Sequence, residues 1–364
     1  MKKGLILITG ATGYIGSHTV VELTASGYDV VGVDNFYNST DDIVGRIGKI
    51  IGNNEGKFYF EKADCSDPVE FERVFEKYPN IVGAIHFAAC KAVNESVHKP
   101  LLYYRNNIVS LLNLIRLMRE RAQTANIVFS SSCTVYGQPE MEELPIKETA
   151  VLRRPLTPYG KTKQMAEEIL SDSVVAYENM NVCALRYFNP IGAHPSALIG
   201  ELPNGVPQNL VPYITQTAAG IRDHLSVFGD DYDTPDGSCI RDYIYVVDLA
   251  KAHVKAMDKL LGGEKAAPVP QENNNSPYTT AEATGRWRVY NIGTGKGVSV
   301  LELVKEFIKV TGVNLKYEIV GRREGDISQV WADPTKSCKE LNWSADTPLG
   351  DVLLSAWRWQ EALK

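Results

Sequence analysis

A short apolar run followed at once by a glycine-rich turn constrains the fold of this chain most strongly. Residues 5–9 read LILIT, the continuous apolar pattern of a buried parallel strand. Gly10, Gly13 and Gly16 follow, and a helical pattern then continues to Ala25. Glycines at this spacing allow a tight turn, the close approach of a pyrophosphate to the backbone, and close packing of helix against strand. The pattern therefore predicts a βα unit that binds a dinucleotide at the start of its helix.

An acidic residue after the second predicted strand narrows the choice of dinucleotide. The apolar run 29–33 ends at Asp34, which lies eighteen residues beyond Gly16. A carboxylate at this point accepts hydrogen bonds from an adenosine ribose and repels a 2′-phosphate. We therefore expect NAD rather than NADP as the cofactor. The competing interpretation is an ordinary tight turn between a strand and a helix.

Predicted strands and helices continue to alternate over roughly the first 190 residues, which indicates an α/β fold with a Rossmann-type, doubly wound parallel sheet. The further strands are predicted at 58–60, 81–89, 127–131 and 181–188, and the further helices at 69–78, 100–121 and 161–177. After Asn189 the alternation weakens, and prolines and glycines are frequent. We therefore expect an NAD-binding domain at 1–189 and a smaller, mixed α/β substrate domain at 190–364.

Polar and aromatic side chains gather where the predicted strands end. In doubly wound sheets, ligands bind at the carboxyl ends of the strands. Residues at or near such ends are Asp64, His86-Phe87-Ala88, Ser130-Ser131-Ser132 and Tyr187-Phe188-Asn189. Their shared placement predicts a site along one edge of the sheet.

The segment TPYGKTK places a tyrosine and a lysine four residues apart at the start of a predicted helix. Tyr159 and Lys163 then share one helix face, and Pro158 stands where a helix tolerates proline. A free phenol has a pKa of about 10, and lowering it by roughly three units requires about 4 kcal/mol of preference for the phenolate. One ammonium at about 4 Å supplies energy of that order at an effective dielectric constant near 20. The pair thus predicts a general base, whereas in isolation it would be a surface tyrosine beside a solvated lysine.

Composition and charge exclude several classes of function. A hydrophobic content of 44% and a charged content of 23% are those of an ordinary globular protein. The net charge of −6 argues against nucleic acid as a partner, and the absence of an apolar run of about 18 residues argues against a membrane span. The six cysteines and the histidines show no metal-binding spacing. We expect a cytoplasmic protein with reduced thiols and no metal.

Several blocks together resemble the UDP-glucose/UDP-galactose 4-epimerases of the extended short-chain dehydrogenase/reductase family. The similar blocks run almost from end to end: TGATGYIGSHTVVEL, IHFAACKAVNESV, FSSSCTVYG, TPYGKTK, LRYFNPIGAHPS, RDYIYVVDLA and RREGD. The glycine motif and the Tyr-x-x-x-Lys pair are shared by many relatives. The combination of RYFNPIGAHPS with RREGD is shared by a much narrower group of proteins.

The resemblance implies an isomerase of galactose metabolism that uses bound NAD⁺ to oxidise C4 of a UDP-hexose and then reduces it from the other face. On this basis Tyr159 is the base, Lys163 is its electrostatic partner, and Ser132 binds the reacting oxygen. The three roles are compatible with general acid–base chemistry. Ser130 and Ser131 remain alternatives at the strand end, because the family block rather than the spacing selects Ser132.

The resemblance also implies binding residues for each ligand. Those for NAD are Gly10, Gly13, Tyr14, Ile15, Gly16, Asp34, Asn35, Ser39, Asp64, Phe87, Ala88, Lys91, Asn106, Ser132, Tyr159, Lys163 and Phe188. Those for the UDP-hexose are Ser132, Tyr159, Asn189, Asn209, Leu210, Phe228, Arg241, Arg323, Asp326 and Val330. Without the resemblance, the residues suggest simpler interpretations. Lys91 and Asn106 would be surface residues, and Arg323 would be a solvated charge beside Glu324. Arg241 would form an ion pair with Asp242.

Two features depart from the family pattern. Residues 262–286 form a polar stretch that we expect to be an added, mobile loop. Val330 stands where many bacterial members carry a tyrosine, so we hypothesise room for an N-acetyl group. The competing interpretation is that Val330 packs beside Trp331.

Three other functions remain open at this point. A sugar-nucleotide 4,6-dehydratase would carry an Asp-Glu pair after the strand-end hydroxyl, where this chain has Cys133-Thr134. A UDP-glucuronate decarboxylase would need a cation for the sugar carboxylate. A non-catalytic NAD-sensing protein is disfavoured because Tyr159 and Lys163 are both present. Family members are often homodimers through a helix pair, and Leu101 to Met118 could supply one helix.

Overall fold

The computed structural model describes residues 3–52, 54–262, 286–323 and 326–363. Two compact units are present, and neither is continuous in sequence. The first comprises residues 1–137, 154–186 and 250–290, and the second comprises 138–153, 187–249 and 291–364. The division expected from the sequence, with NAD binding by residues 1–189 and substrate binding by residues 190–364, stays a prediction. Most of the polar stretch predicted at 262–286 lies outside the described residues.

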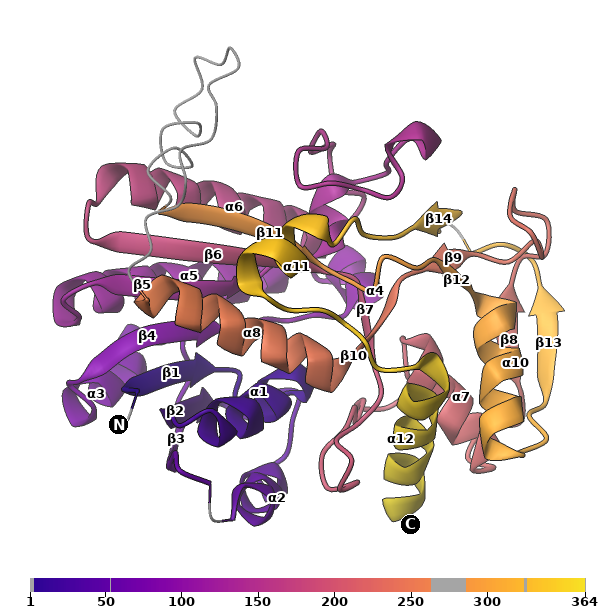
Figure 1. Cartoon of the computed structure of the whole chain (residues 1–364), viewed down its shortest axis with the longest axis horizontal. Helices are drawn as coiled ribbons and strands as arrows, with labels where there is room; N and C mark the ends of the chain where they lie inside the picture. The colour runs from indigo at the N-terminus through magenta and orange to yellow at the C-terminus, as the bar shows by residue number, and fades with distance from the viewer. Residues whose placement is uncertain (1–2, 53, 263–285, 324–325, 364) are drawn as a thin grey trace. The chain divides into compact units, whose positions relative to one another are not determined.

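The first unit is built on a seven-stranded sheet with the order β11-β6-β5-β4-β1-β2-β3 (Figure 1). The strands are β1 (Leu5–Thr9), β2 (Asp29–Asp34), β3 (Phe58–Lys62), β4 (Ile81–His86), β5 (Ala125–Ser130), β6 (Met180–Tyr187) and β11 (Trp287–Ile292). All pairings from β3 to β6 are parallel, with Thr9 opposite both Val33 and His86. The predicted doubly wound α/β fold is confirmed, and since β3, β4 and β5 run parallel, the predicted residues that follow them lie along one edge of the sheet.

Helices cover both faces of this sheet. They are α1 (Tyr14–Ala25), α2 (Asp42–Ile51), α3 (Pro68–Lys77), α4 (Val93–His98), α5 (Pro100–Arg121), α6 (Pro158–Ala176) and α8 (Val246–Leu261), with the 3-10 turn η1 (Cys133–Tyr136) after β5. One hydrophobic cluster joins the sheet to α3, α5 and α6 through side chains such as Leu114 and Leu170. Helices α1 and α8 lie in front of the strands in Figure 1. The approach of α8 is close, since a Cβ atom added at Gly83 would lie 2.6 Å from Met257 Sδ.

Three details of the first unit differ from the sequence prediction. Strand β11 joins the sheet beside β6, although it lies about 100 residues further along the chain and outside the predicted cofactor domain. Helices α2 and α4 were not predicted. Helix α6 begins at Pro158 rather than near residue 161, because the Thr157 hydroxyl accepts a hydrogen bond from Gly160 N and caps the first turn.

The second unit is a mixed α/β arrangement of short elements. They are η2 (Met141–Glu143), β7 (Asn189–Ile191), α7 (Leu210–Ala218), β8 (Leu225–Phe228), β9 (Ile240–Arg241), β10 (Tyr243–Tyr245), β12 (Val298–Ser299), α10 (Val300–Thr311), β13 (Tyr317–Val320), β14 (Gln329–Val330), α11 (Thr335–Leu341) and α12 (Leu349–Ala362). Strand β10 pairs with β7, β13 with β8, and β9 lies between β12 and β14. This unit therefore holds the segments for which the family blocks imply nucleotide binding.

Two further observations concern the described part of the chain. None of its helices is both long and apolar enough to span a membrane. Among the same residues, no group of three or more His, Cys, Asp or Glu side chains is arranged to hold a metal ion.

Candidate active site

The glycine turn after β1 has no room for side chains. Gly10 adopts φ +72°, and a Cβ atom added there would lie 2.9 Å from Ala88 N, in the loop after β4. A Cβ atom added at Gly16 would lie 2.1 Å from the carbonyl oxygen of Gly10. Gly13 caps α1 in an extended conformation, and no side chain caps this helix start. The turn therefore presents backbone N–H groups to an anion, as a pyrophosphate site requires.

Asp34 ties the end of β2 to the glycine turn. Its buried carboxylate accepts hydrogen bonds from Thr12 N at 3.1 Å and from Phe36 N at 2.9 Å. The Ser39 hydroxyl lies 3.4 Å from the same carboxylate and 2.7 Å from the Thr12 hydroxyl. Each carboxylate oxygen has two lone pairs, so Asp34 keeps capacity for a ribose hydroxyl.

Asn35 and Asp64, which end neighbouring strands, are brought together. Asn35 Nδ2 donates to Asp64 Oδ2 at 3.1 Å. Burial alone would raise the pKa of Asp64, but hydrogen bonds from Ser66 and Asn35 hold that pKa below its ordinary value. Asp64 therefore stays ionised at neutral pH, ready to accept a hydrogen bond from an amino group such as that of adenine.

Most of the other predicted cofactor residues also belong to this unit. Lys91 is exposed, with its Nζ 5.9 Å from the centre of the Tyr14 ring at the helix start. Phe87 and Ala88 follow β4 directly, and their amides donate to the backbone and the hydroxyl of Thr9. Asn106 donates to Asn107, whose side chain binds Cys90 and Thr162. The remaining residue, Phe188, falls in the second unit.

Three consecutive serines at the end of β5 make three different contacts. The Ser130 carbonyl accepts a hydrogen bond from Lys163 Nζ at 2.5 Å. The Ser131 hydroxyl donates to Glu167 Oε1 at 2.5 Å. The Ser132 hydroxyl caps η1 by accepting a hydrogen bond from Thr134 N at 3.2 Å, and it lies near enough to Tyr159 to lower the pKa of that phenol. Of the three, Ser132 is thus the one that contacts the predicted base.

The ionisation of Tyr159 and Lys163 differs from the sequence prediction. The Tyr159 side chain is partly buried, and the desolvation that results raises the pKa of Tyr159 to about 12. The nearby Cys133 thiol acts in the same direction and the Ser132 hydrogen bond in the opposite one. Burial also lowers the pKa of Lys163 to about 7, against the opposing charge of Glu167. In the protein alone, desolvation therefore outweighs the attraction between the pair, and the expected lowering of the phenol pKa was wrong.

A buried charge network below Lys163 was not predicted. Arg186 on β6 donates to both carboxylate oxygens of Glu167, at 2.9 and 2.6 Å, and to the Tyr136 hydroxyl at 3.1 Å. The side chains of Arg186 and Glu167 are 5% and 4% exposed. The position of Glu167, four residues after Lys163 on the same helix face, was a signal that could have revealed it.

In the second unit, two arginines converge on one carboxylate. Arg323 donates to Asp326 through Nε at 3.1 Å and NH2 at 2.7 Å, and Arg241 NH2 lies 3.6 Å from the same side chain. The alternative that Arg241 pairs with Asp242 was wrong, because Asp242 is buried and accepts hydrogen bonds from the backbone N–H groups of Thr294, Gly295 and Ala332. Glu324 lies outside the described residues. Asp326 thus aligns two guanidinium groups of the kind that bind diphosphates.

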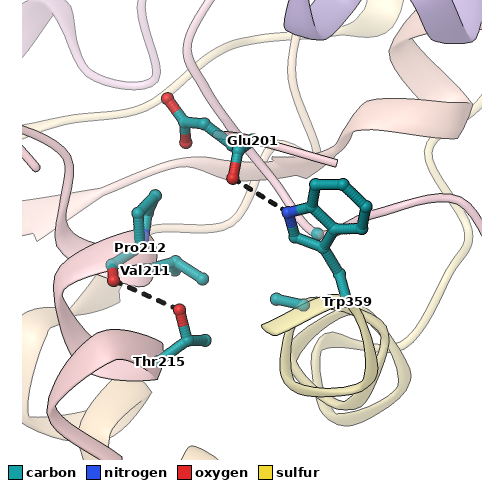
Figure 2. A pocket seen from close by; sticks show the side chains of 7 residues that line it. Glu201, Val211, Pro212, Thr215 and Trp359 are labelled. Carbon is teal, nitrogen blue, oxygen red and sulfur yellow. Dashed lines mark hydrogen bonds between the residues drawn. The ribbon is translucent and has the colours of Figure 1, made fainter. Parts of the chain in front are cut away.

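The segment that leads to Asn209 and to Leu210, the first residue of α7, is held by hydrogen bonds from within it and from α12. Asn209 stands at the N-cap position of α7 without a capping side-chain hydrogen bond, and its Nδ2 instead donates to Glu201 Oε1 at 2.7 Å. Figure 2 shows Trp359 Nε1 donating at 3.0 Å to the backbone oxygen of Glu201. The hollow in that view is lined by α7 and α12 residues such as Thr215, whose hydroxyl donates to Pro212 O. The hydrogen bonds beside this hollow, rather than the hollow itself, hold the segment before α7 in place.

The last predicted substrate residues lie on short strands of the same unit. Val330 is buried on β14 opposite Arg241 of β9, and Asn189 begins β7 with its N–H donated to Asp242 O. Phe228 ends β8, and the Arg323 guanidinium lies 5.6 Å from its ring centre. Val330, Arg241, Phe228 and Arg323 are therefore placed by two small sheets.

Comparison with known proteins gives full-length matches. A model of the family described as GDP-mannose 4,6 dehydratase matches residues 7–354. The chain is 45% identical to the UDP-glucose 4-epimerase of Yersinia enterocolitica over 98% of this chain and 97% of that protein. It is 47% identical to that of Bacillus subtilis (strain 168), with the same coverage. The chain belongs to the UDP-glucose 4-epimerase family.

Solved structures of the UDP-glucose 4-epimerase family agree with the fold. One is the enzyme from Stenotrophomonas maltophila with bound NAD and formylated UDP-arabinopyranose, with a TM-score of 0.87 at 42% identity over 99% of this chain and 98% of that one. Another, from Bifidobacterium longum in complex with NAD⁺ and UDP, has a TM-score of 0.85 at 43% identity over 98% of each chain. The resemblance stated from the sequence blocks is confirmed.

Proposed function

We propose that this member of the UDP-glucose 4-epimerase family is an NAD-dependent isomerase that interconverts UDP-galactose and UDP-glucose through a transient 4-keto sugar. The observation that carries the proposal is that Ser132, at the end of β5, acts on the Tyr159 phenol at the start of α6 and lowers its pKa against burial. The pair lies at the edge of the sheet that also bears the glycine turn. A proton acceptor, a neutral donor and a dinucleotide turn in one unit are what reversible oxidation of an alcohol requires.

The cofactor residues are proposed from the geometry of the first unit. Gly10, Gly13 and Gly16 leave room for a pyrophosphate at the start of α1, and Asp34 keeps acceptor capacity for a ribose. When bound there, NAD⁺ would supply the acceptor and donor of the hydride exchanged with C4 of the hexose, and a positive ring charge. The proton transfers in both directions belong to side chains of this chain.

The proton steps follow from the positions of Ser132 and Tyr159. Ser132 donates a hydrogen bond to the 4-oxygen of the sugar, and Tyr159 accepts the hydroxyl proton as the C4 hydride leaves, which gives the ketone. Tyr159 returns the proton to the oxygen once the hydride comes back on the opposite face. Because burial raises the pKa of Tyr159 to about 12 in the protein alone, the phenolate forms only beside positive charge, to which protonated Lys163 contributes.

The nucleotide residues are proposed from the second unit. Arg241 and Arg323 would bind the diphosphate, each as a planar fork that matches two oxygens. Asp326 orients both guanidinium groups before the ligand arrives. Asn189, Asn209, Leu210 and Phe228 would contact the rest of the nucleotide. Firm binding of UDP leaves the hexose free to turn between oxidation and reduction.

The proposal is tested with the purified protein and no added cofactor. We expect the protein to carry NAD and to convert UDP-galactose to UDP-glucose until equilibrium, with no net change in NADH absorbance. Release of UDP-4-keto-6-deoxyhexose would instead favour a dehydratase, and carbon dioxide from UDP-glucuronate would favour a decarboxylase. The side chains after Ser132 are Cys133 and Thr134, which supply no acid pair for elimination. Bound NAD without turnover of any UDP-sugar would leave only the NAD-sensing alternative.

A second sugar pair follows from Val330. This buried residue opposite Arg241 is small, and we propose that it leaves room for an N-acetyl group at C2 of the hexose. We expect turnover of UDP-N-acetylgalactosamine, and we expect Val330→Tyr to abolish that turnover while UDP-galactose turnover persists. The measurement is kcat/KM for both pairs in both proteins. No detectable conversion of the N-acetylated pair by the unmodified protein would refute the idea.

Location and assembly complete the proposal. We propose a cytoplasmic homodimer that binds neither nucleic acid nor membranes. A net charge of −6 supports the absence of nucleic acid binding. Helices α5 and α6 carry exposed apolar side chains, with Leu101, Leu112 and Met165 81%, 47% and 45% exposed, and these suit a helix-pair interface.

A further inference from the structure

The proton steps described above do not use two buried charged residues near Lys163, Glu167 and Arg186. Glu167 lies one helical turn beyond Lys163 on α6 and is bound by two nitrogen atoms of Arg186, a residue of β6. Arg186 is buried as fully as Glu167, and Glu167 raises the pKa of Arg186 although burial opposes it. A bidentate pair in a dry interior offsets its desolvation cost only with good geometry and further hydrogen bonds. Tyr136 and Ser131 supply those further bonds.

The same network holds the end of β5. Glu167 accepts the hydroxyl of Ser131, while Ser131 N donates to Leu185 O of β6 at 2.9 Å. The peptides on either side of Ser131 carry the Ser130 carbonyl, which binds Lys163, and Ser132, which contacts Tyr159. Fixing Ser131 from both sides therefore fixes the two groups that orient the base and its ammonium partner.

Several elements around Lys163 carry charged or titratable groups. Tyr159 and Glu167 lie on α6, His86 on β4, Cys133 on η1 and Arg186 on β6. His86 is buried and neutral, since burial and the Lys163 charge lower its pKa to about 3. Glu167, on the same helix face, acts on Lys163 directly, since its charge raises the pKa of the lysine against burial, and Arg186 is the cation bound to that carboxylate.

We propose that Glu167 and Arg186 are positioning residues: together they hold the strand end that places Lys163, Glu167 favours the protonated form of Lys163 while Tyr159 works, and Arg186 limits that effect. This inference rests on the proposed function. Removal of either charge leaves the other uncompensated, and the two changes have opposite signs at Lys163. If the pair were purely structural, replacing Glu167 and replacing Arg186 would both lower activity or stability. Neither change would then shift the Lys163 pKa in the direction opposite to the other.

The test measures the ionisation of Lys163 directly and also the pH dependence of turnover. Competitive acylation of Lys163 across a pH series, read by peptide mass spectrometry, reports the pKa of its amine whether or not the protein epimerises sugars. We expect Glu167→Gln to move this pKa, and the alkaline limb of kcat, down by about one pH unit or more. We expect Arg186→Met to move both upward. Shifts in the same direction, or lower rates with no shift, would overturn the proposal.

Charge-conserving variants serve as controls and protect the test against misfolding. Ser131→Ala removes one hydrogen bond without changing a charge, and Glu167→Asp keeps the charge with a shorter side chain. Both are expected to lower kcat severalfold and to leave the acylation pKa within experimental error. If Arg186→Met does not fold, the comparison of Glu167→Gln with Glu167→Asp decides the matter. If the Lys163 pKa shifts as expected but the unmodified protein converts no UDP-sugar, the proposed function is rejected. The positioning role of Glu167 and Arg186 is then still supported.

Discussion

Replacement of Tyr159 by phenylalanine is expected to lower kcat by about two to four orders of magnitude, the usual contribution of a positioned proton-transfer group. The substitution removes one oxygen atom from a side chain whose ring is held in the first turn of α6. The glycine turn and Asp34 are untouched, so NAD should remain bound. The measurements are the steady-state rate of UDP-galactose conversion and the NAD content of the purified variant.

The Tyr159→Phe result has a matched control. Tyr317 lies at the start of β13 in the second unit and is 39% exposed, so Tyr317→Phe removes the same atom from a surface position. Its rate should equal that of the unmodified protein. If Tyr159→Phe kept the full rate with NAD bound, the assignment of the base would be refuted.

The second large effect is expected at Gly16. Gly16→Ala would place a Cβ atom 2.1 Å from the Gly10 carbonyl oxygen, a backbone atom that cannot rotate away. The turn must then move, and the N–H groups that form the pyrophosphate site move with it. We expect loss of co-purified NAD and a decrease of about 3 kcal/mol in the free energy of unfolding, the upper end of overpacking costs. NAD content and urea denaturation measure the two effects.

Gly48 provides the control for this substitution. It lies inside α2, and a Cβ atom added there has no neighbour within 4 Å. Gly48→Ala should therefore raise the free energy of unfolding by about 0.5–1 kcal/mol, because alanine loses less backbone entropy in a helix. Full NAD content in Gly16→Ala would contradict the role assigned to the turn.

The local part of the site could be predicted from short stretches of sequence. The glycine turn, Asp34 and the Tyr159–Lys163 pair depend on contacts between residues close along the chain, so their spacing carries the information. The parallel sheet followed from the alternation of apolar runs. Strand β11 was missed because its place beside β6 depends on packing against a strand about 100 residues away, which no local pattern records.

The electrostatics of the site could not be predicted in the same way. The sequence placed a lysine beside a phenol and suggested attraction, whereas burial raises the pKa of Tyr159 to about 12 and lowers that of Lys163 to about 7. Desolvation depends on every atom around a group, and those atoms come from several separate segments. The same holds for Arg186, which reaches Glu167 only because β6 pairs with β5.

The sequence by itself determined the dinucleotide turn, the parallel α/β fold and the family. Each of these depends on residue spacing within a single segment or on long blocks of similar sequence. Only the tertiary structure decided which of three serines contacts the phenol, which carboxylate aligns Arg241 and Arg323, and what charge lies beneath Lys163. The physical reason is distance. Hydrogen bonds and desolvation act over a few ångströms in space, and many of the partners at those distances, such as Arg186 and Glu167 or Arg241 and Asp326, come from separate segments of the chain.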